Sequence, residues 1–335
     1  MTDPHSFPLV SIILGTWNGE SFLHEQLDSL FLQTYQNVQI IAIDDGSSDR
    51  TVEILNEYAS RHRNMQVVVN EANLGFVKNF EKGARLSAGD LISFCDQDDW
   101  WHPQKIERMV AARDNHPMIF CDSALCDEHL QPMGRNISDL VHQQSFYDCR
   151  QLCVFSRMYG HAIVVTRDLF EKATPFIKEM PHDGWLAFHA TLYGGAKFLP
   201  EPLVKYRQHA ANVFGVVGRK RKKQPALPFP NGQTSQPHAV SLPHADSLPR
   251  AEKKKAELAR IRTRMSAFCA ACPDALAPQK RLLLALVDCY RNFSPWNDTK
   301  RMFLFFANYK WLLTVKRYPV WRKYLFCLKM FVKIK

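Results

Sequence analysis

The stretch SFCDQDDWWHP, residues 93–103, is the most informative feature of this sequence. An apolar run in it is followed at once by Asp96, Gln97, Asp98 and Asp99. Three carboxylates this close repel one another unless a cation lies among them, and a hard divalent metal that holds a diphosphate is the usual reason to tolerate them. The stretch therefore predicts a metal–diphosphate site. The alternative is a solvated acidic turn between a strand and a helix.

Two further apolar runs end in polar clusters. Residues 10–14 are followed by GTWNG, and residues 38–43 are followed by DDGSSD. In an open α/β sheet the carboxyl ends of the strands meet at one edge, where such folds bind their ligands. We therefore expect the three polar clusters to share one crevice.

Helical patterns alternate with these runs. Apolar residues recur at helical spacing in 22–31 and from residue 52 to 58, and a further strand at 66–69 precedes a helix at 76–87. Gly75 permits a tight turn before that helix, and Lys78 near its start can meet a phosphate. Strands that alternate with helices predict an α/β fold with a mostly parallel sheet.

Six motifs in this order resemble the family 2 glycosyltransferases: VSIILGTWNG, IIAIDDGSSDRT, NEANLGFVKNF, AGDLISFCDQDDWWHP, HDGWL and YRQHAANVFG. These are inverting enzymes with a nucleotide-sugar-binding GT-A fold, and the match covers residues 8–214. The last two motifs resemble most closely the bacterial rhamnosyltransferases of surface polysaccharide synthesis. The resemblance implies a donor such as dTDP-rhamnose or a UDP-sugar. It also implies a glycan or lipid-linked glycan acceptor in O-antigen, lipopolysaccharide or capsule biosynthesis.

The resemblance also implies which residues bind the nucleotide. Thr16, Trp17 and Asn18 match the first-strand motif that holds the base, and Asp45 matches the acid that pairs with uracil or thymine. Lys78 matches a position that faces the nucleotide.

The acidic motif is implied to bind both the donor and a metal. Asp96 and Gln97 are expected on the nucleotide-sugar side, and Asp98 is expected to bind Mn²⁺ or Mg²⁺, with Asp99 behind it. Downstream, Arg207 is a candidate for the diphosphate and His209 for the metal. The alternative for His209 is a structural role, which is the commoner one for a lone histidine.

Transfer to an alcohol needs one general base. His182 and Asp183 are the candidates, and Asp183 matches the family's catalytic carboxylate. The alternative makes Asp183 a helix N-cap and His182 a loop residue. The chain is thus expected to be a metal-dependent hexosyltransferase. The alternative is a protein of the same fold that only binds nucleotide sugars or acts as a scaffold.

Charge divides the chain into two parts. Residues 1–214 contain 18 Lys and Arg against 27 Asp and Glu, whereas residues 215–335 contain 25 against 6. We expect a catalytic domain over 1–214, a flexible linker rich in basic residues and proline over 215–250, and a basic helical extension over 251–335.

The last segment, 301–335, combines nine basic residues with many aromatic ones and has no acid. Such a composition suits an anionic membrane surface, while its apolar run is too short and interrupted to span a bilayer. Pro319 should separate two short helices. The alternatives are aromatic packing on the catalytic core, and nucleic-acid binding, against which no recognised motif is present.

The remaining features favour the cytoplasm. The N-terminus has neither a basic region nor an apolar stretch, and nine cysteines at scattered spacings predict unpaired thiols. We therefore expect a cytoplasmic protein that lies peripherally on the inner face of the plasma membrane.

Overall fold

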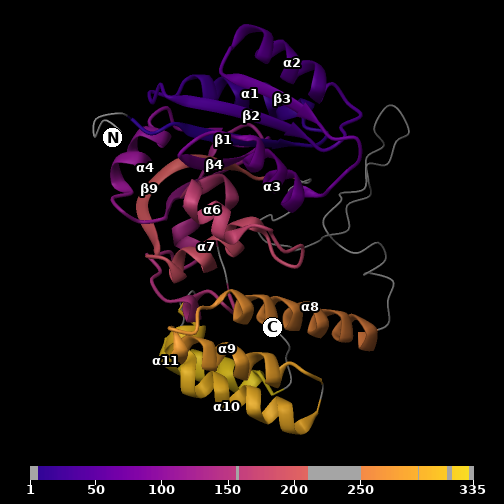
Figure 1. The fold of residues 1–335 in the computed structure, drawn as a ribbon, viewed down its shortest axis with the longest axis vertical. Helices are drawn as coiled ribbons and strands as arrows, with labels where there is room; N and C mark the ends of the chain where they lie inside the picture. Colours follow the sequence, from indigo (N-terminus) through magenta and orange to yellow (C-terminus); the bar gives the residue numbers. More distant parts are fainter. Residues whose placement is uncertain (1–6, 156–157, 210–249, 293, 315–318, 332–335) are drawn as a thin grey trace.

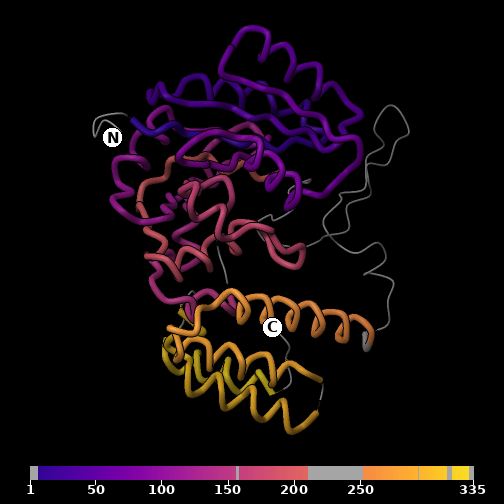
Figure 2. Tube along the Cα trace, viewed as in Figure 1, coloured from indigo at the N-terminus to yellow at the C-terminus, as the bar shows by residue number. Residues whose placement is uncertain are grey.

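The computed structural model describes residues 7–155, 158–209, 250–292, 294–314 and 319–331. Residues 7–209 form an α/β part, and residues 250–331 form a group of helices that lies below it in Figures 1 and 2. The linker expected over 215–250 lies outside the described residues, except for Arg250 at the start of the first C-terminal helix.

One sheet runs through the α/β part, with strand order β3-β2-β1-β4-β8-β6-β9-β5 and β7 paired to β6. Its strands are β1 (Val10–Thr16), β2 (Val38–Asp44), β3 (Met65–Val69), β4 (Leu91–Asp96), β5 (Trp100–Trp101), β6 (Met118–Cys126), β7 (Pro132–Asn136), β8 (Ile163–Thr166) and β9 (Ala196–Arg207). The first four are parallel. The α/β fold is therefore confirmed.

The register of β1 places the three polar clusters side by side. Thr16 lies opposite Asp44 of β2, and Gly15 lies opposite Asp96 of β4. The carboxyl ends of these strands therefore meet at one edge of the sheet, as expected, and a crevice shared by the loops that follow them stays a prediction.

The other half of the sheet is mixed. β8 is antiparallel to both β4 and β6, β9 is parallel to β6, and the short strands β5 and β7 pair antiparallel to β9 and β6. Because β8 runs against β4, the residues just before β8 lie at the edge where β4 ends.

Helices cover both faces of the sheet (Figure 1). One face packs on α1 (Glu20–Phe31), α2 (Thr51–Arg61) and α4 (Lys105–Ala112), and the other packs on α3 (Phe76–Leu86), α6 (Arg167–Ala173) and α7 (His182–Leu192). Side chains alternate along each strand, so Ile12 joins Leu27 on the first face while Ile13 joins Phe80 on the second. One turn of helix, α5 (Ile137–Leu140), and two 3₁₀ turns, η1 (Cys149–Gln151) and η2 (Gly160–Ala162), lie between β7 and β8.

The C-terminal helices continue the second core. They are α8 (Arg250–Ala271), α9 (Ala277–Cys289), α10 (Pro295–Leu312) and α11 (Val320–Lys329). Phe268 of α8 stacks on Phe188 of α7 with ring centroids 3.9 Å apart. The expected break at Pro319 is confirmed, because Pro319 caps α11. All nine cysteines are unpaired, and within the described ranges no helix is long and apolar enough to cross a membrane.

Candidate functional site

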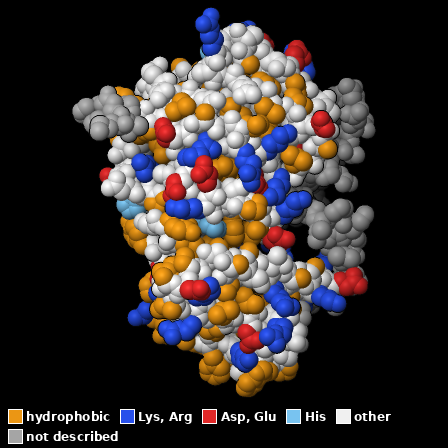
Figure 3. All heavy atoms as spheres, viewed as in Figure 1, with side chains coloured by type: hydrophobic (Ala, Val, Ile, Leu, Met, Phe, Trp, Pro, Cys, Tyr) orange, Lys and Arg blue, Asp and Glu red, His pale blue; other side chains and the backbone are white. Residues whose placement is uncertain are grey.

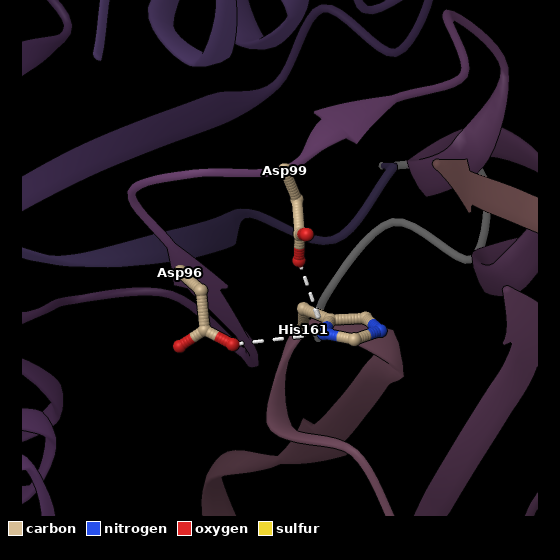
Figure 4. Close-up of side chains that lie close together, drawn as sticks. All are labelled: Asp96, Asp99 and His161. Atoms are coloured by element: carbon tan, nitrogen blue, oxygen red, sulfur yellow. Dashed lines mark ion pairs between the residues drawn. The ribbon is translucent and has the colours of Figure 1, made fainter. Parts of the chain in front are cut away.

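The acidic turn lies between β4 and β5 and contains one exposed and one buried carboxylate. The Asp96 side chain is 43% exposed, whereas Asp99 is fully buried. One Asp99 oxygen, Oδ1, accepts a hydrogen bond from the Arg207 backbone N–H at 3.0 Å, and the other lies 3.0 Å from Nδ1 of His161. Figure 4 shows His161 pointing between Asp96 and Asp99.

This group has the composition of a cation site. The ligand atoms of Asp96, Asp99 and His161 all lie within 4.8 Å of one another. Burial raises the pKa of Asp99 well above its ordinary value, and the charges of Asp98 and Asp96 act in the same direction. Its buried Oδ2 has no hydrogen-bond partner of good geometry among the described residues. A bound cation would stabilise the ionised Asp99 carboxylate and would give its Oδ2 a partner.

A second pair of donor groups lies on the same turn. Nε2 of His209 lies 2.7 Å from Oδ2 of Asp98, although the two residues are 111 positions apart. Their side chains are 10% and 17% exposed, and the Phe22 ring packs 4.7 Å from the imidazole. The structure thus brings together the two residues that the sequence assigned to a metal.

Arg207 is buried next to the acidic turn, and its guanidinium binds groups of the protein. Its Nε donates to the Asp98 carbonyl at 2.7 Å, and its two terminal nitrogens donate to the Glu128 carbonyl and to the Glu25 carboxylate. The guanidinium also packs over Phe22. These contacts make Arg207 a residue that positions the acidic turn.

The first-strand motif is tied to the acidic turn through Gln97. Its Oε1 accepts from the Trp17 N–H at 2.8 Å, and its Nε2 donates to the Trp17 carbonyl at 3.0 Å. A Cβ atom on Gly19 would come within 2.3 Å of the Gln97 amide, so a larger residue there would displace that side chain. Thr16 donates to Asp44, and the Asn18 side chain accepts from the Ser48 N–H.

Asp45 holds the loop after β3. Its carboxylate accepts hydrogen bonds from the Asn70 side chain and from the N–H groups of Leu74 and Gly75, at 2.7 to 2.9 Å. Gly75 has a φ of 78°, which favours glycine. Recognition of a base by Asp45 therefore stays a prediction.

Lys78 is also engaged within the protein. Its Nζ donates to Glu81 at 2.6 Å and to the Phe176 carbonyl at 2.7 Å, and its side chain is 29% exposed. Contact with the nucleotide stays a prediction, and these two bonds leave the third N–H of the ammonium group for it.

Asp183 is the second residue of α7 and keeps a partly exposed side chain. Burial of the carboxylate raises its pKa to about 7, and the charge of Asp96 acts in the same direction. The structure thus places Asp183 within electrostatic reach of the acidic turn. Its Oδ1 accepts a 2.6 Å hydrogen bond from the adjacent Gly184 N–H, and the N-cap position belongs to Pro181.

His182 has a different environment from its neighbour. It is buried among Phe80, Phe94 and other rings, and neither ring nitrogen has a partner in the described part of the chain. Burial lowers its pKa to about 3, so the ring is neutral at physiological pH. His182 packs in the core, which leaves Asp183 as the candidate base.

His161 is the site residue that the sequence motifs do not reveal. It lies in η2, directly before β8, and reaches Asp96 because β8 runs antiparallel to β4. Its Nε2 lies 3.0 Å from the Ser123 hydroxyl of β6. The only sequence signal is a lone histidine before a short apolar run.

Part of this chain is similar to proteins of a known family. Residues 11–173 match the model of the family described as "Glycosyl transferase family 2". This segment belongs to glycosyltransferase family 2. An uncharacterized glycosyltransferase of Haemophilus influenzae is 25% identical over 238 residues, which cover 64% of this chain and 70% of that protein. Uncharacterized glycosyltransferase RP339 of Rickettsia prowazekii is 29% identical over 213 residues, 62% of this chain and 66% of its own length.

Solved structures of similar fold extend beyond the family 2 segment. The crystal structure of S. aureus TarS 1–349 superposes with a TM-score of 0.56 at 15% identity, and covers 96% of this chain and 80% of that one. The mannosyltransferase PcManGT from Pyrobaculum calidifontis, in complex with GDP-Man and Mn²⁺, has a TM-score of 0.50 at 15% identity, with coverages of 98% and 87%. The fold of this chain is therefore GT-A with a helical C-terminal region.

Proposed function

We propose that this protein transfers a sugar from a nucleoside-diphosphate sugar to a hydroxyl group, with inversion at the anomeric carbon. Asp183 acts as the general base that accepts the proton of the attacking hydroxyl. The nucleotide lies in the crevice at the ends of β1, β2 and β4, where Thr16, Trp17, Asn18 and the loop held by Asp45 meet.

The observation that carries this proposal is the state of Asp183. A base must be ionised to accept a proton and must still hold that proton well, so a pKa near the working pH is optimal. Burial raises the pKa of the Asp183 carboxylate to about 7, and the charge of Asp96 contributes to this rise. An Asp that only capped a helix would have its pKa lowered by the N–H groups it satisfies.

The acidic turn suits a divalent cation, Mn²⁺ or Mg²⁺, that neutralises charge on the departing diphosphate. An ion that contacts substrate needs ligands open to the crevice, and Asp98, His209 and Asp96 are more exposed than Asp99 and His161. We therefore assign the ion to Asp98 and His209, with Asp96 beside the donor. Asp99, His161 and Arg207 then fix the shape of the turn.

The similar structures support a nucleotide-sugar donor. TarS has been solved with UDP and with UDP-GlcNAc, and PcManGT with GDP-Man and Mn²⁺. For this chain we propose dTDP-rhamnose or a UDP-sugar as donor and a glycan or lipid-linked glycan as acceptor, in the synthesis of a bacterial surface polysaccharide. A lipid-linked acceptor would place the enzyme at the inner face of the plasma membrane.

The test is a donor screen. The full chain is incubated with a panel of nucleotide sugars, an alcohol acceptor and Mn²⁺ or Mg²⁺, and released nucleoside diphosphate is measured. The proposal predicts release with one donor class, and NMR of the product should show an inverted anomeric centre. Retained configuration would contradict direct displacement.

The second hypothesis is a protein that binds nucleotide sugars without turning them over. It predicts donor binding by calorimetry with no release of nucleoside diphosphate for any donor and acceptor pair. The raised pKa of Asp183 favours the enzyme, because a binding protein gains nothing from a destabilised carboxylate.

A further inference from the structure

Helix α11 exposes an apolar stripe to solvent. Apolar residues recur along it at spacings of three and four positions, which lie on one side of a helix. All of them are 41% to 57% exposed: Val320, Trp321, Tyr324, Leu325 and Leu328 in the helix, and Phe331 just after its end. A surface helix of an ordinary globular protein turns such a stripe inward.

The opposite side of α11 is fixed to the protein, so the stripe cannot turn inward. Cys327 and Met330 are buried, and Phe326 packs on Phe155 with ring centroids 5.5 Å apart. The buried Arg301 of α10 donates from Nε to the Met330 carbonyl at 2.9 Å. The exposed stripe is therefore a rigid feature of the fold.

Basic residues border the stripe. Arg322 and Lys329 are exposed, α11 contains no acid, and the Arg322 guanidinium lies 5.1 Å from the Trp321 ring. Cations beside aromatic rings match lipid phosphates beside the glycerol and acyl region of a bilayer. Binding to an apolar face of a protein partner would not require this excess of positive charge beside the stripe.

More apolar surface lies on the neighbouring helices. Trp296 and Phe303 of α10, 69% and 63% exposed, border a cleft of about 570 Å³ between α9 and α10. Figure 3 shows hydrophobic side chains gathered at the lower end of the molecule, where Figure 1 places α10. The catalytic crevice lies in the other part of the chain, so a surface bound at α11 would leave it free.

We propose that the apolar stripe of α11 docks the protein on a bilayer that contains anionic lipid, with the helix lying in the plane of the interface. Its 10 residues extend only about 15 Å, so the helix rests on the membrane and does not cross it. This inference rests on the proposed function in one respect, because a lipid-linked acceptor gives the docked enzyme its substrate.

The test is sedimentation of the full chain with vesicles, which needs neither donor nor turnover. The protein should sediment with vesicles of phosphatidylcholine and phosphatidylglycerol, and less with phosphatidylcholine alone. The triple variant Trp321→Ser, Leu325→Ser, Leu328→Ser should bind about tenfold more weakly or worse, because three buried apolar side chains are lost from the bilayer. Arg322→Gln with Lys329→Gln should weaken binding to the anionic vesicles only.

A matched control replaces three exposed leucines of the α/β part: Leu32→Ser, Leu86→Ser and Leu140→Ser. This variant should sediment like the unmodified chain. Equal sedimentation of the α11 variant and the unmodified chain would overturn the proposal. A dimer in sedimentation equilibrium that the α11 substitutions abolish would also overturn it, because the stripe would then belong to a second copy. Nucleoside diphosphate release, measured separately, reports on the proposed function.

Discussion

Nε2 of His209 lies 2.7 Å from Oδ2 of Asp98, and this contact joins the end of β9 to the acidic turn after β4. Neighbouring contacts reinforce the junction, because the Arg207 backbone N–H and Nε both bind the turn. The acidic turn is therefore shaped by residues more than a hundred positions away in the sequence.

We expect Asp98→Asn and His209→Ala each to weaken Mn²⁺ binding about tenfold or more, because each removes a proposed ligand. Electron paramagnetic resonance of Mn²⁺ with the protein measures the affinity without any donor. His129→Ala is the control, since that side chain is 79% exposed and lies outside the turn. If His161→Ala loses Mn²⁺ binding while His209→Ala keeps it in full, the ion is bound by Asp96, Asp99 and His161 instead.

Arg207→Lys should destabilise the fold by about 2–3 kcal/mol, because a lysine cannot replace the three hydrogen-bonding nitrogens of the buried guanidinium. The measurement is urea unfolding followed by circular dichroism. Arg108→Lys is the matched control: Arg108 pairs with Glu201 at the surface, and its replacement should cost less than about 1 kcal/mol. Equal unfolding midpoints for the two variants would show that Arg207 does not hold the turn.

The rate of transfer should rise with pH up to about 7 and then level off. Asp183 must be ionised to act as base, and burial raises its pKa to about 7. Below that value the rate should fall about tenfold per pH unit. The pH profile of kcat/KM measures this pKa in the free enzyme. A rate that is flat between pH 5 and 8 would contradict a base with this pKa.

Asp183→Asn should also stabilise the folded protein at pH 8 and change it little at pH 4. The folded-state pKa of this carboxyl is raised, so its contribution to stability is present below the unfolded pKa and is lost as pH rises through about 7. Thermal unfolding of both forms at the two pH values checks this. A variant that is less stable at pH 8 would indicate that the carboxylate forms favourable bonds instead.

Phe268→Ala should cost about 3–5 kcal/mol, because Phe268 is fully buried against Phe188 where the helical and α/β parts meet. Phe303→Ala, at an exposed position of α10, should change stability by less than about 0.5 kcal/mol. Differential scanning calorimetry compares the two. Similar effects of both substitutions would show that the two parts do not share a core.

The local features of the site could be predicted from the sequence, whereas its long-range contacts could not. The ends of β1, β2 and β4 were predictable because apolar runs stop at polar clusters, and parallel strands bring those ends together. The place of His161 in the site was not predictable. It depends on β8 pairing antiparallel to β4, and periodicity does not reveal strand direction. The burial of Arg207 and the engagement of Lys78 likewise depend on partners distant in sequence.

The aromatic C-terminal segment shows the same limit. Composition predicted helices, a break at Pro319 and a basic surface, but not which rings are buried. Phe305 packs in the core while Trp321 faces solvent, because burial depends on which side of each helix packs against the rest of the protein.

The proposed mechanism depends on Asp183, which removes the proton from the attacking hydroxyl. The most direct measurement is the single-turnover rate of Asp183→Asn with a donor found in the screen, together with donor affinity by calorimetry. We predict a rate about 10² to 10⁴ times lower with unchanged donor affinity, while Asp168→Asn, at an exposed position on α6, keeps the full rate. An Asp183→Asn enzyme that transfers sugar at the unmodified rate would contradict the account.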